Sequence, residues 1–273
     1  MTQPIKRLVV SLDAVSETGL AIDTAARLAT RWHVPLHGVF IEDEELIGLA
    51  GLPFARQVTL TTGLGPLTKN HIEDHFRAFA ARSRRELAAA ADRHGIQWSF
   101  EVVRGPLAAV SLGGEHDFLV AGATTRPVGD HFRVASRCWS LTTSIARPLL
   151  LAKRQWETGG SIFALLRRRD RQSARMLEIA AQIAGISRAA LTVAAPPHLA
   201  DADDFAAWVS GLLEGHSLSL QTESAATEPA ALRQRIIELD CRLLVLEGSP
   251  DEGRPEELRE LVEPLACDVL VVR

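Results

Sequence analysis

The residues best suited to chemistry in this sequence form a loop between two apolar segments. Gly122, Thr124 and Thr125 follow the apolar segment 118–121. Nine further residues separate Thr125 from Ala135 and Ser136, which precede a helix-like stretch. α/β proteins build phosphate sites where a strand leads into a loop of small residues and then a helix, because free backbone N–H groups there bind an anion. The pattern favours a ligand that carries phosphate.

Other residue types that do chemistry occur in weaker patterns. His71 and His75 lie four residues apart, but the glutamate is misplaced for an H-E-x-x-H motif and no third ligand follows. Cys138, Cys241 and Cys267 are far apart and outside any C-x-x-C pattern, which argues against a zinc site and a disulfide framework. The sequence contains no Walker lysine loop and no nucleophile elbow. We therefore expect no catalytic residues and no metal site.

The elements that must position the loop are alternating strands and helices. Near-continuous apolar strands of this kind indicate a parallel sheet with helices on both faces. Both halves of the chain open with a strand, a helix and a strand, at an offset of about 155 residues: 8–12, 20–29 and 36–41, then 162–166, 176–184 and 191–194. The sequence predicts an α/β protein of two tandem, doubly wound, five-stranded parallel-sheet domains, residues 1–154 and 160–273, joined near Gly159 and Gly160.

Ligands of such sheets bind at the carboxyl ends of the strands. In the first half these ends are 13–16, 40–42 and 122–125, and they include Asp13, Ala14 and Ile41. The second strand end is followed by an acidic run, 42–45, that suits the start of a helix because the helix dipole favours negative charge there. A glycine- and proline-containing stretch, 48–65, is expected to pass over the strand ends as a lid, a docking surface or a packing loop.

This arrangement resembles the universal stress protein family in its tandem two-domain form, an adenine nucleotide alpha hydrolase-like fold. The family's first strand ends in an aspartate followed by small residues, as at Asp13. Its nucleotide loop has the spacing Gly, two residues, Gly, nine residues and Gly-Ser or Gly-Thr, which Gly122, Thr125, Ala135 and Ser136 keep. The resemblance implies that Asp13 contacts the base or ribose of an adenine nucleotide. The full set of implied contacts is Asp13, Ala14, Ile41, Gly122, Thr124, Thr125, Ala135 and Ser136.

Two positions of this loop depart from the family pattern. Glycine there supplies positive φ or lets a phosphate approach the backbone closely. Thr125 is β-branched and poorly suited to positive φ, whereas Ala135 adds one methyl group, and Ser136 can still cap the next helix. The expected ligand is ATP with Mg²⁺, ADP or AMP, of which AMP and ADP demand least of the loop. The alternative is that Asp13 only caps a helix and the loop holds nothing.

The second half departs further from the nucleotide-binding pattern. At the offset of 155 residues Arg168 takes the position of Asp13, within an arginine-rich run, 167–171, and no glycine-rich cradle follows segment 243–246. Cations at a helix start are opposed by the helix dipole, so the run needs an explanation. It forms a solvated loop, binds an anion or acidic partner, or pairs with an acidic loop that contains Asp251, Glu252, Glu256 and Glu257.

Assembly and partners follow from apolar edges and charge. Segments 149–152 and 269–272 have no polar alternation, so we expect them to pair with each other as an intrachain pseudo-dimer, with a homodimer still open. Residues 1–154 contain 18 Lys and Arg against 15 Asp and Glu, and residues 155–273 contain 12 against 19. With these counts and no broad basic face, nucleic acid is a weak candidate partner. No apolar stretch reaches the ~18 residues of a membrane span. Together with the three isolated cysteines, which suit a reducing compartment, this favours a cytoplasmic protein.

The function expected from the sequence is a non-enzymatic stress-response regulatory or adaptor protein that binds an adenine nucleotide in its first half. One alternative is a nucleotide-hydrolysing enzyme of related fold, against which the sequence offers no evident base or metal cluster around the loop. Another is an interaction module in which both sites are lost. The sequence identifies no protein partner.

Overall fold

The structure is a computed structural model, and it describes residues 5–14, 18–50, 52, 56–59, 63–105, 114, 116–123, 147–225, 228–248 and 260–273. The first half contains β1 (Arg7–Leu12), α1 (Thr18–Trp32), β2 (Leu36–Glu42), α2 (Glu44–Leu49), β3 (Arg56–Thr59), β4 (Gly63–Pro66), α3 (Lys69–His94), β5 (Trp98–Arg104), β6 (Asp117–Gly122) and β7 (Leu149–Ala152).

The second half contains β8 (Ser161–Leu165), α5 (Arg171–Ser187), β9 (Ala190–Ala195), α6 (Pro197–Ala200), α7 (Phe205–Leu212), β10 (Leu220–Ser224), α8 (Pro229–Glu238), β11 (Cys241–Glu247) and β12 (Asp268–Val272). The link between the halves includes Gly159 and Gly160, which both adopt positive φ, 86° and 79°. Glycine adopts such a backbone without the steric cost that other residues meet.

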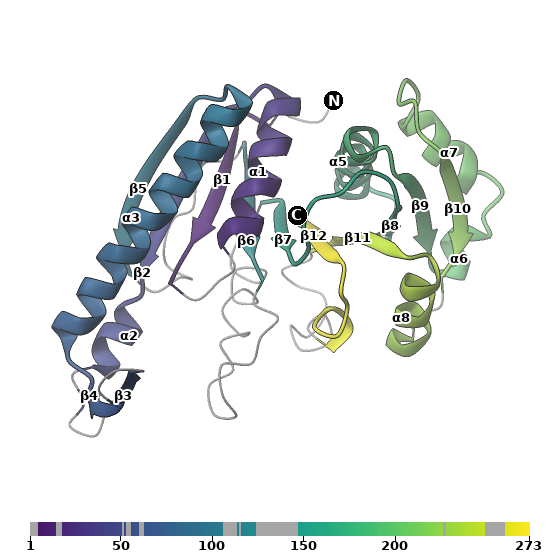
Figure 1. Ribbon diagram of the computed structural model, residues 1–273. Helices are drawn as coiled ribbons and strands as arrows, with labels where there is room; N and C mark the ends of the chain where they lie inside the picture. The colour runs from purple at the N-terminus through teal and green to yellow at the C-terminus, as the bar shows by residue number, and fades with distance from the viewer. Residues whose placement is uncertain are drawn as a thin grey trace.

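One ten-stranded sheet runs through both halves in the order β10-β9-β8-β11-β12-β7-β6-β1-β2-β5 (Figure 1). Each half contributes five parallel strands, β5-β2-β1-β6-β7 and β10-β9-β8-β11-β12, and the two orders correspond strand for strand. The predicted fold class, two tandem five-stranded α/β units, is confirmed.

The two halves meet where β7 pairs with β12, through Leu149↔Val271, Leu150↔Leu270 and Leu151↔Val269. This pairing confirms the prediction that the two apolar edge strands cover each other. It is antiparallel, so the complete sheet is mixed. Equivalent edges that meet about an approximate twofold axis run in opposite directions, which explains this exception to the parallel pattern.

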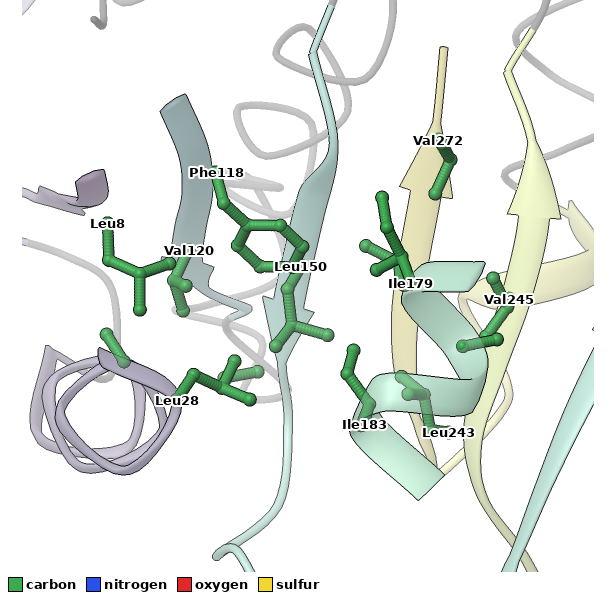
Figure 2. Close-up of a cluster of buried hydrophobic side chains, with 14 of the residues drawn as sticks. Leu8, Leu28, Phe118, Val120, Leu150, Ile179, Ile183, Leu243, Val245 and Val272 are labelled. Carbon is green, nitrogen blue, oxygen red and sulfur yellow. The ribbon is translucent and has the colours of Figure 1, made fainter. Parts of the chain in front are cut away.

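Each face of the sheet carries an apolar core. One core contains buried side chains of α1, α3, α5 and α7 and continues across the junction, where Leu28 and Leu150 lie near Ile179 and Ile183 (Figure 2). The other core contains side chains of α8 and of residues 261–267. Because the first core belongs to both halves, the junction is packed as an interior.

The long helix α3 has clear start and stop signals. Thr68 caps its first turn by accepting a hydrogen bond from the His71 N–H at 3.3 Å, and Gly95 ends it at φ 65°. Gly38 in β2 lets the helix approach, because a Cβ at that position would lie 2.7 Å from Leu87. These two signals bound the helix at Lys69 and His94.

Two further predictions concern the segment after β2. Asp43 caps α2 by accepting the Glu45 N–H at 2.8 Å, so the acidic run does open a helix. The stretch expected to cross the strand ends contains an antiparallel pair of short strands, β3 and β4. None of the described helices is both long and apolar enough to cross a membrane.

Candidate functional site

The candidate site lies at the carboxyl edge of the first half, where the chain leaves β1 for β2 on one side while β6 lies on the other. Ligands of open α/β sheets bind at such a reversal of strand order. The register Leu12↔Phe40 and Ser11↔Ala121 places Asp13, Ile41 and Gly122 together at this edge. The structure therefore brings together the described members of the predicted set.

These residues offer different chemistry. Asp13 and Ala14 are half-buried directly after β1, while Ile41 is 2% exposed and contributes its side chain to the core below the edge. Gly122 ends β6, and the next residue, Ala123, donates its backbone N–H to Ala152 at 2.9 Å. Thr124, Thr125, Ala135 and Ser136 lie outside the described residues. The ligand role of all eight residues stays a prediction.

A charged network borders this edge on the β2 and β5 side. Glu42 and Arg104 are paired in register as the last residues of their strands, with Arg104 Nε 2.9 Å from the Glu42 carboxylate. Glu73 of α3 lies 3.5 Å from the same guanidinium, and the Gly105 N–H donates to the Glu42 carbonyl at 3.1 Å. The hydrogen bond to Glu42 raises the pKa of Arg104, which therefore stays charged.

The charged side chains on this border determine which chemical groups the edge attracts. The Arg104 guanidinium offsets part of the charge of Glu42 and Glu73. The Asp13 carboxylate suits hydroxyl and amino groups, which donate hydrogen bonds, and repels phosphate.

The second half has a corresponding edge, and its register corrects one residue assignment. Leu36 of β2 corresponds to Leu191 of β9, at an offset of 155 residues. Their partners in the neighbouring strands are Leu8 and Ile162, so the first strands of the two halves are offset by 154 residues. Arg167 therefore corresponds to Asp13, one position before Arg168. The offset of 155 holds for the following strand and for the helix ends, where His33 and Arg188 share φ values of 55° and 54°.

The same register identifies a substitution that the sequence comparison missed. Gly122 pairs with Ala152 and Glu247 with Val272 at the equivalent ends of the fourth and fifth strands of each half. The following residues also match, because Gly248 donates its N–H to Val272 at 2.8 Å as Ala123 does to Ala152. A glutamate thus takes the place of the glycine at which the predicted phosphate loop begins.

Glu247 is held inside the second edge, where its residue is 8% exposed. Burial raises the pKa of its carboxyl group, whereas the Ser173 hydroxyl, the Arg167 backbone and the Arg168 charge act in the opposite direction. Within the described part of the chain, Glu247 Oε1 has no hydrogen-bond partner. A buried carboxyl group therefore stands in the second half where the first half has the glycine of the predicted phosphate loop.

Other side chains close the second edge around Glu247. Gln172, in the first turn of α5, donates from Nε2 to the carbonyls of Gly248 and Val272 at 2.8 and 3.2 Å. Asp170 caps the same helix by accepting the Ser173 N–H at 2.9 Å. The two Gln172 hydrogen bonds join the helix start to the ends of β11 and β12.

The arginine-rich run has partners within its own half. The Arg169 guanidinium donates to both Asp204 carboxylate oxygens at 2.7 and 3.0 Å and lies 5.1 Å from the Trp208 ring centroid. Arg168 Nε lies 3.7 Å from the Asp170 carboxylate. The acidic residues Asp251, Glu252, Glu256 and Glu257 lie outside the described residues, so their predicted pairing with the run stays a prediction.

Comparisons with known proteins agree with this architecture. No protein-family model and no curated protein matches the sequence. A universal stress protein from Archaeoglobus fulgidus DSM 4304 matches 98% of this chain and 96% of its own, with a TM-score of 0.68 and 11% identity. This chain has the universal stress protein fold.

Two structures from Pseudomonas aeruginosa share that fold. A putative universal stress protein from strain UCBPP-PA14 has a TM-score of 0.61, and a functionally unknown protein from strain PAO1 has 0.60. Each is 16% identical, and each match covers 98% of this chain and 92% of the other. At these identities the likeness concerns the universal stress protein fold and not its ligands.

Some of the site features that the sequence did not predict in this universal stress protein fold could have been inferred from the residues. Glu42 and Arg104 both end apolar strands, so their meeting at one edge was open to inference. Glu247 also ends an apolar strand, but its equivalence to Gly122 needs the observed register. His71 and His75 are exposed, and the described residues contain no group of three His, Cys, Asp or Glu side chains placed to hold a metal.

Proposed function

We propose that this chain is a regulatory or adaptor protein whose first half binds an adenine nucleotide, while its second half has lost that capacity. The observation that carries the proposal is the convergence of Asp13, Ile41 and Gly122 on three neighbouring strands at a reversal of strand order. Such a reversal leaves a crevice that is open to a ligand because the connecting loops diverge from it.

The proposed contacts follow from the chemistry of the edge. Asp13 accepts hydrogen bonds from the ribose or the base, and backbone N–H groups after Gly122 receive the phosphates. AMP and ADP are the preferred ligands because Thr125 and Ala135 replace glycine in the phosphate loop; ATP would bring Mg²⁺ as part of the ligand. Binding without turnover would make the nucleotide a signal rather than a substrate.

The test is a binding titration with a matched variant in each half. Purified protein is examined for bound nucleotide by chromatography and then titrated calorimetrically with AMP, ADP and ATP. Asp13→Ala should weaken binding roughly tenfold to a hundredfold, the usual worth of a hydrogen bond to a charged group. Arg167→Ala, at the equivalent exposed position of the second half, should leave the affinity unchanged.

Each alternative outcome has a distinct meaning. Absence of any bound nucleotide together with no titration signal would overturn the proposal and favour an interaction module. Release of phosphate from Mg-ATP at catalytic turnover would favour the hydrolase. An equal loss of affinity in both variants would show that the second half shares the site.

A further inference from the structure

Two buried cysteines lie at the amino-terminal edge of the second half, on the side of the sheet opposite to Glu247. Cys241 begins β11 and Cys267 directly precedes β12. They are 6% and 3% exposed, and both are free thiols. Their spacing in the sequence gave no indication that they meet.

An irregularity in β11 brings the two thiols to the same level. Along β8 a single step separates Ser161 from Ile162, but their partners in β11 are Cys241 and Leu243, so β11 holds one extra residue there. Leu243 pairs with Asp268 of β12, and removing the extra residue from the count sets Cys241 opposite Cys267.

The same irregularity brings both sulfurs to one face of the sheet. Residues two apart in a regular strand share a face, yet Cys241 and Leu243 belong to different cores. Cys241 lies with Cys267 in the core that also contains Leu265 and Phe163. Neighbouring strands are about 4.8 Å apart, within the ~4.4–6.8 Å between Cα atoms that a disulfide requires.

The surroundings of the pair make the two sulfurs chemically different. The Cys241 thiol lies within hydrogen-bonding reach of Cys267 and 3.2 Å from the Leu243 carbonyl. The hydrogen bond from Cys241 and the charge of Lys153 lower the pKa of Cys267, against the effects of burial and of Asp268. The hydrogen bond to Cys267 and burial raise the pKa of Cys241.

Lys153 is held beside the pair by the fold itself. Its Nζ donates to the carbonyls of Val262 and Leu265 at 2.7 and 3.0 Å, at the end of the helical turn that precedes Cys267. A cation near one sulfur and a proton donor on the other are the conditions that favour a thiolate and a resolving thiol.

We propose that Cys241 and Cys267 form an oxidisable dithiol that closes to a disulfide with hydrogen peroxide as the oxidant. The Cys267 thiolate attacks one peroxide oxygen, the O–O bond breaks, hydroxide leaves, and Cys267 carries a sulfenic acid. The Cys241 sulfur then attacks the Cys267 sulfur, the S–O bond breaks, and the Cys241 proton leaves with hydroxide as water. Both thiols are oxidised by two electrons in total, and one peroxide is reduced.

The product would connect β11 to β12, the strand that joins the two halves through β7. Because β12 is antiparallel to β7, the cysteines lie on the same side of the sheet as the carboxyl ends of the first-half strands. None of the residues of the pair belongs to the proposed nucleotide site, so this proposal does not depend on that one. Because both sulfurs are buried, the reaction should be slower than that of an exposed thiol and limited by local opening.

The test uses the full chain with Cys138→Ser, which leaves only this pair. After prolonged exposure to peroxide and quenching, denatured protein should have lost both titratable thiols and two hydrogens in mass, and a digest should link the peptides that contain Cys241 and Cys267. Dithiothreitol should restore both thiols. Two free thiols, or sulfinic acid without a linked peptide, would overturn the proposal.

A second variant tests the assigned roles of the two sulfurs. With Cys241→Ala in the same background, dimedone should label Cys267, because no resolving thiol remains to remove the sulfenic acid. With Cys267→Ala, Cys241 should remain unlabelled under the same conditions. Labelling of Cys241 in preference to Cys267 would contradict the assignment. If either variant folds poorly, the Cys138→Ser protein, which keeps both cysteines, still provides the linked-peptide result.

Discussion

The two halves of this protein share a strand order and a register but differ at the carboxyl edges of their sheets. Where the first half has Asp13 and Gly122, the second has Arg167 and Glu247. The carboxylate has moved from the first strand to the fourth, and a cation stands in its old position. This exchange reverses the charge that each end of a nucleotide would meet.

The interior shows the opposite behaviour. Leu150 and Leu270 occupy equivalent positions and face each other across the junction, both buried. The apolar packing at the junction is therefore alike in both halves, whereas the side chains at the strand ends differ. The difference illustrates that a shared fold does not imply a shared site.

The largest effect is expected from giving the first half the glutamate of the second. Gly122→Glu would place a carboxylate beside the phosphates, and two like charges about 4 Å apart near a protein surface repel by ~4 kcal/mol, roughly a thousandfold in affinity. Calorimetric titration with ADP measures this loss. Gly211→Glu, at an exposed position of α7 with open space around it, is the charge-matched control. Unchanged binding in Gly122→Glu would remove the phosphates from the end of β6.

A smaller effect is expected where the halves are equivalent. Leu150→Ala and Leu270→Ala each remove a buried side chain at the junction, 1% and 0% exposed, and each should lower the free energy of unfolding by about 2–5 kcal/mol. Urea denaturation of the two variants gives the comparison. If the losses of unfolding free energy in the two variants differed by more than about 3 kcal/mol, the two sides of the junction would be packed unequally.

The buried carboxyl of the second half should make stability depend on pH. The pKa of Glu247 is raised in the folded state, so its contribution is fully present below its unfolded value near 4.5 and is lost as pH rises through the folded value. Glu247→Gln should remove this loss and raise the melting temperature at pH 7 by roughly 2–4 °C, with little change at pH 4. Thermal melts across this pH range test it, with exposed Glu214→Gln as the control. A gain that is equal at both pH values would mean that Glu247 does not titrate in this window.

The smallest effect is expected at the arginine-rich run. Arg169→Ala removes the contacts with Asp204 and Trp208, which are partly open to solvent, and should lower the melting temperature slightly without changing nucleotide affinity. Arg169→Lys keeps the charge but loses the two-pronged hydrogen bond, so it should lie between the variant and the parent. A change in nucleotide affinity in either protein would connect this region to the first-half site.

Much of the fold could be predicted because apolar patterns report burial directly. Segments 149–152 and 269–272 lack any polar position, and their pairing follows from the cost of leaving such edges open. The site was harder, since a difference of one residue in register moves the counterpart of Asp13 from Arg168 to Arg167. The exchange of Gly122 for Glu247 is visible only once strand partners are known.

The thiol pair illustrates the same limit at shorter range. Nothing in the spacing of Cys241 and Cys267 suggests contact, because their meeting depends on one extra residue in β11. Apolar composition predicts that a strand forms. It does not predict β-bulges, which determine the residue that each side chain faces on the neighbouring strand.

The pairing of β7 with β12 also has a consequence for folding during synthesis. Asp268, which opens β12, is made 115 residues after Lys153, which directly follows β7. At about 5–20 residues per second the ribosome needs roughly 6–23 s to cover that interval, during which the apolar edge of β7 has no strand partner. The first half must therefore emerge as an incomplete sheet, and we expect that interval to be when the nascent chain most needs a chaperone.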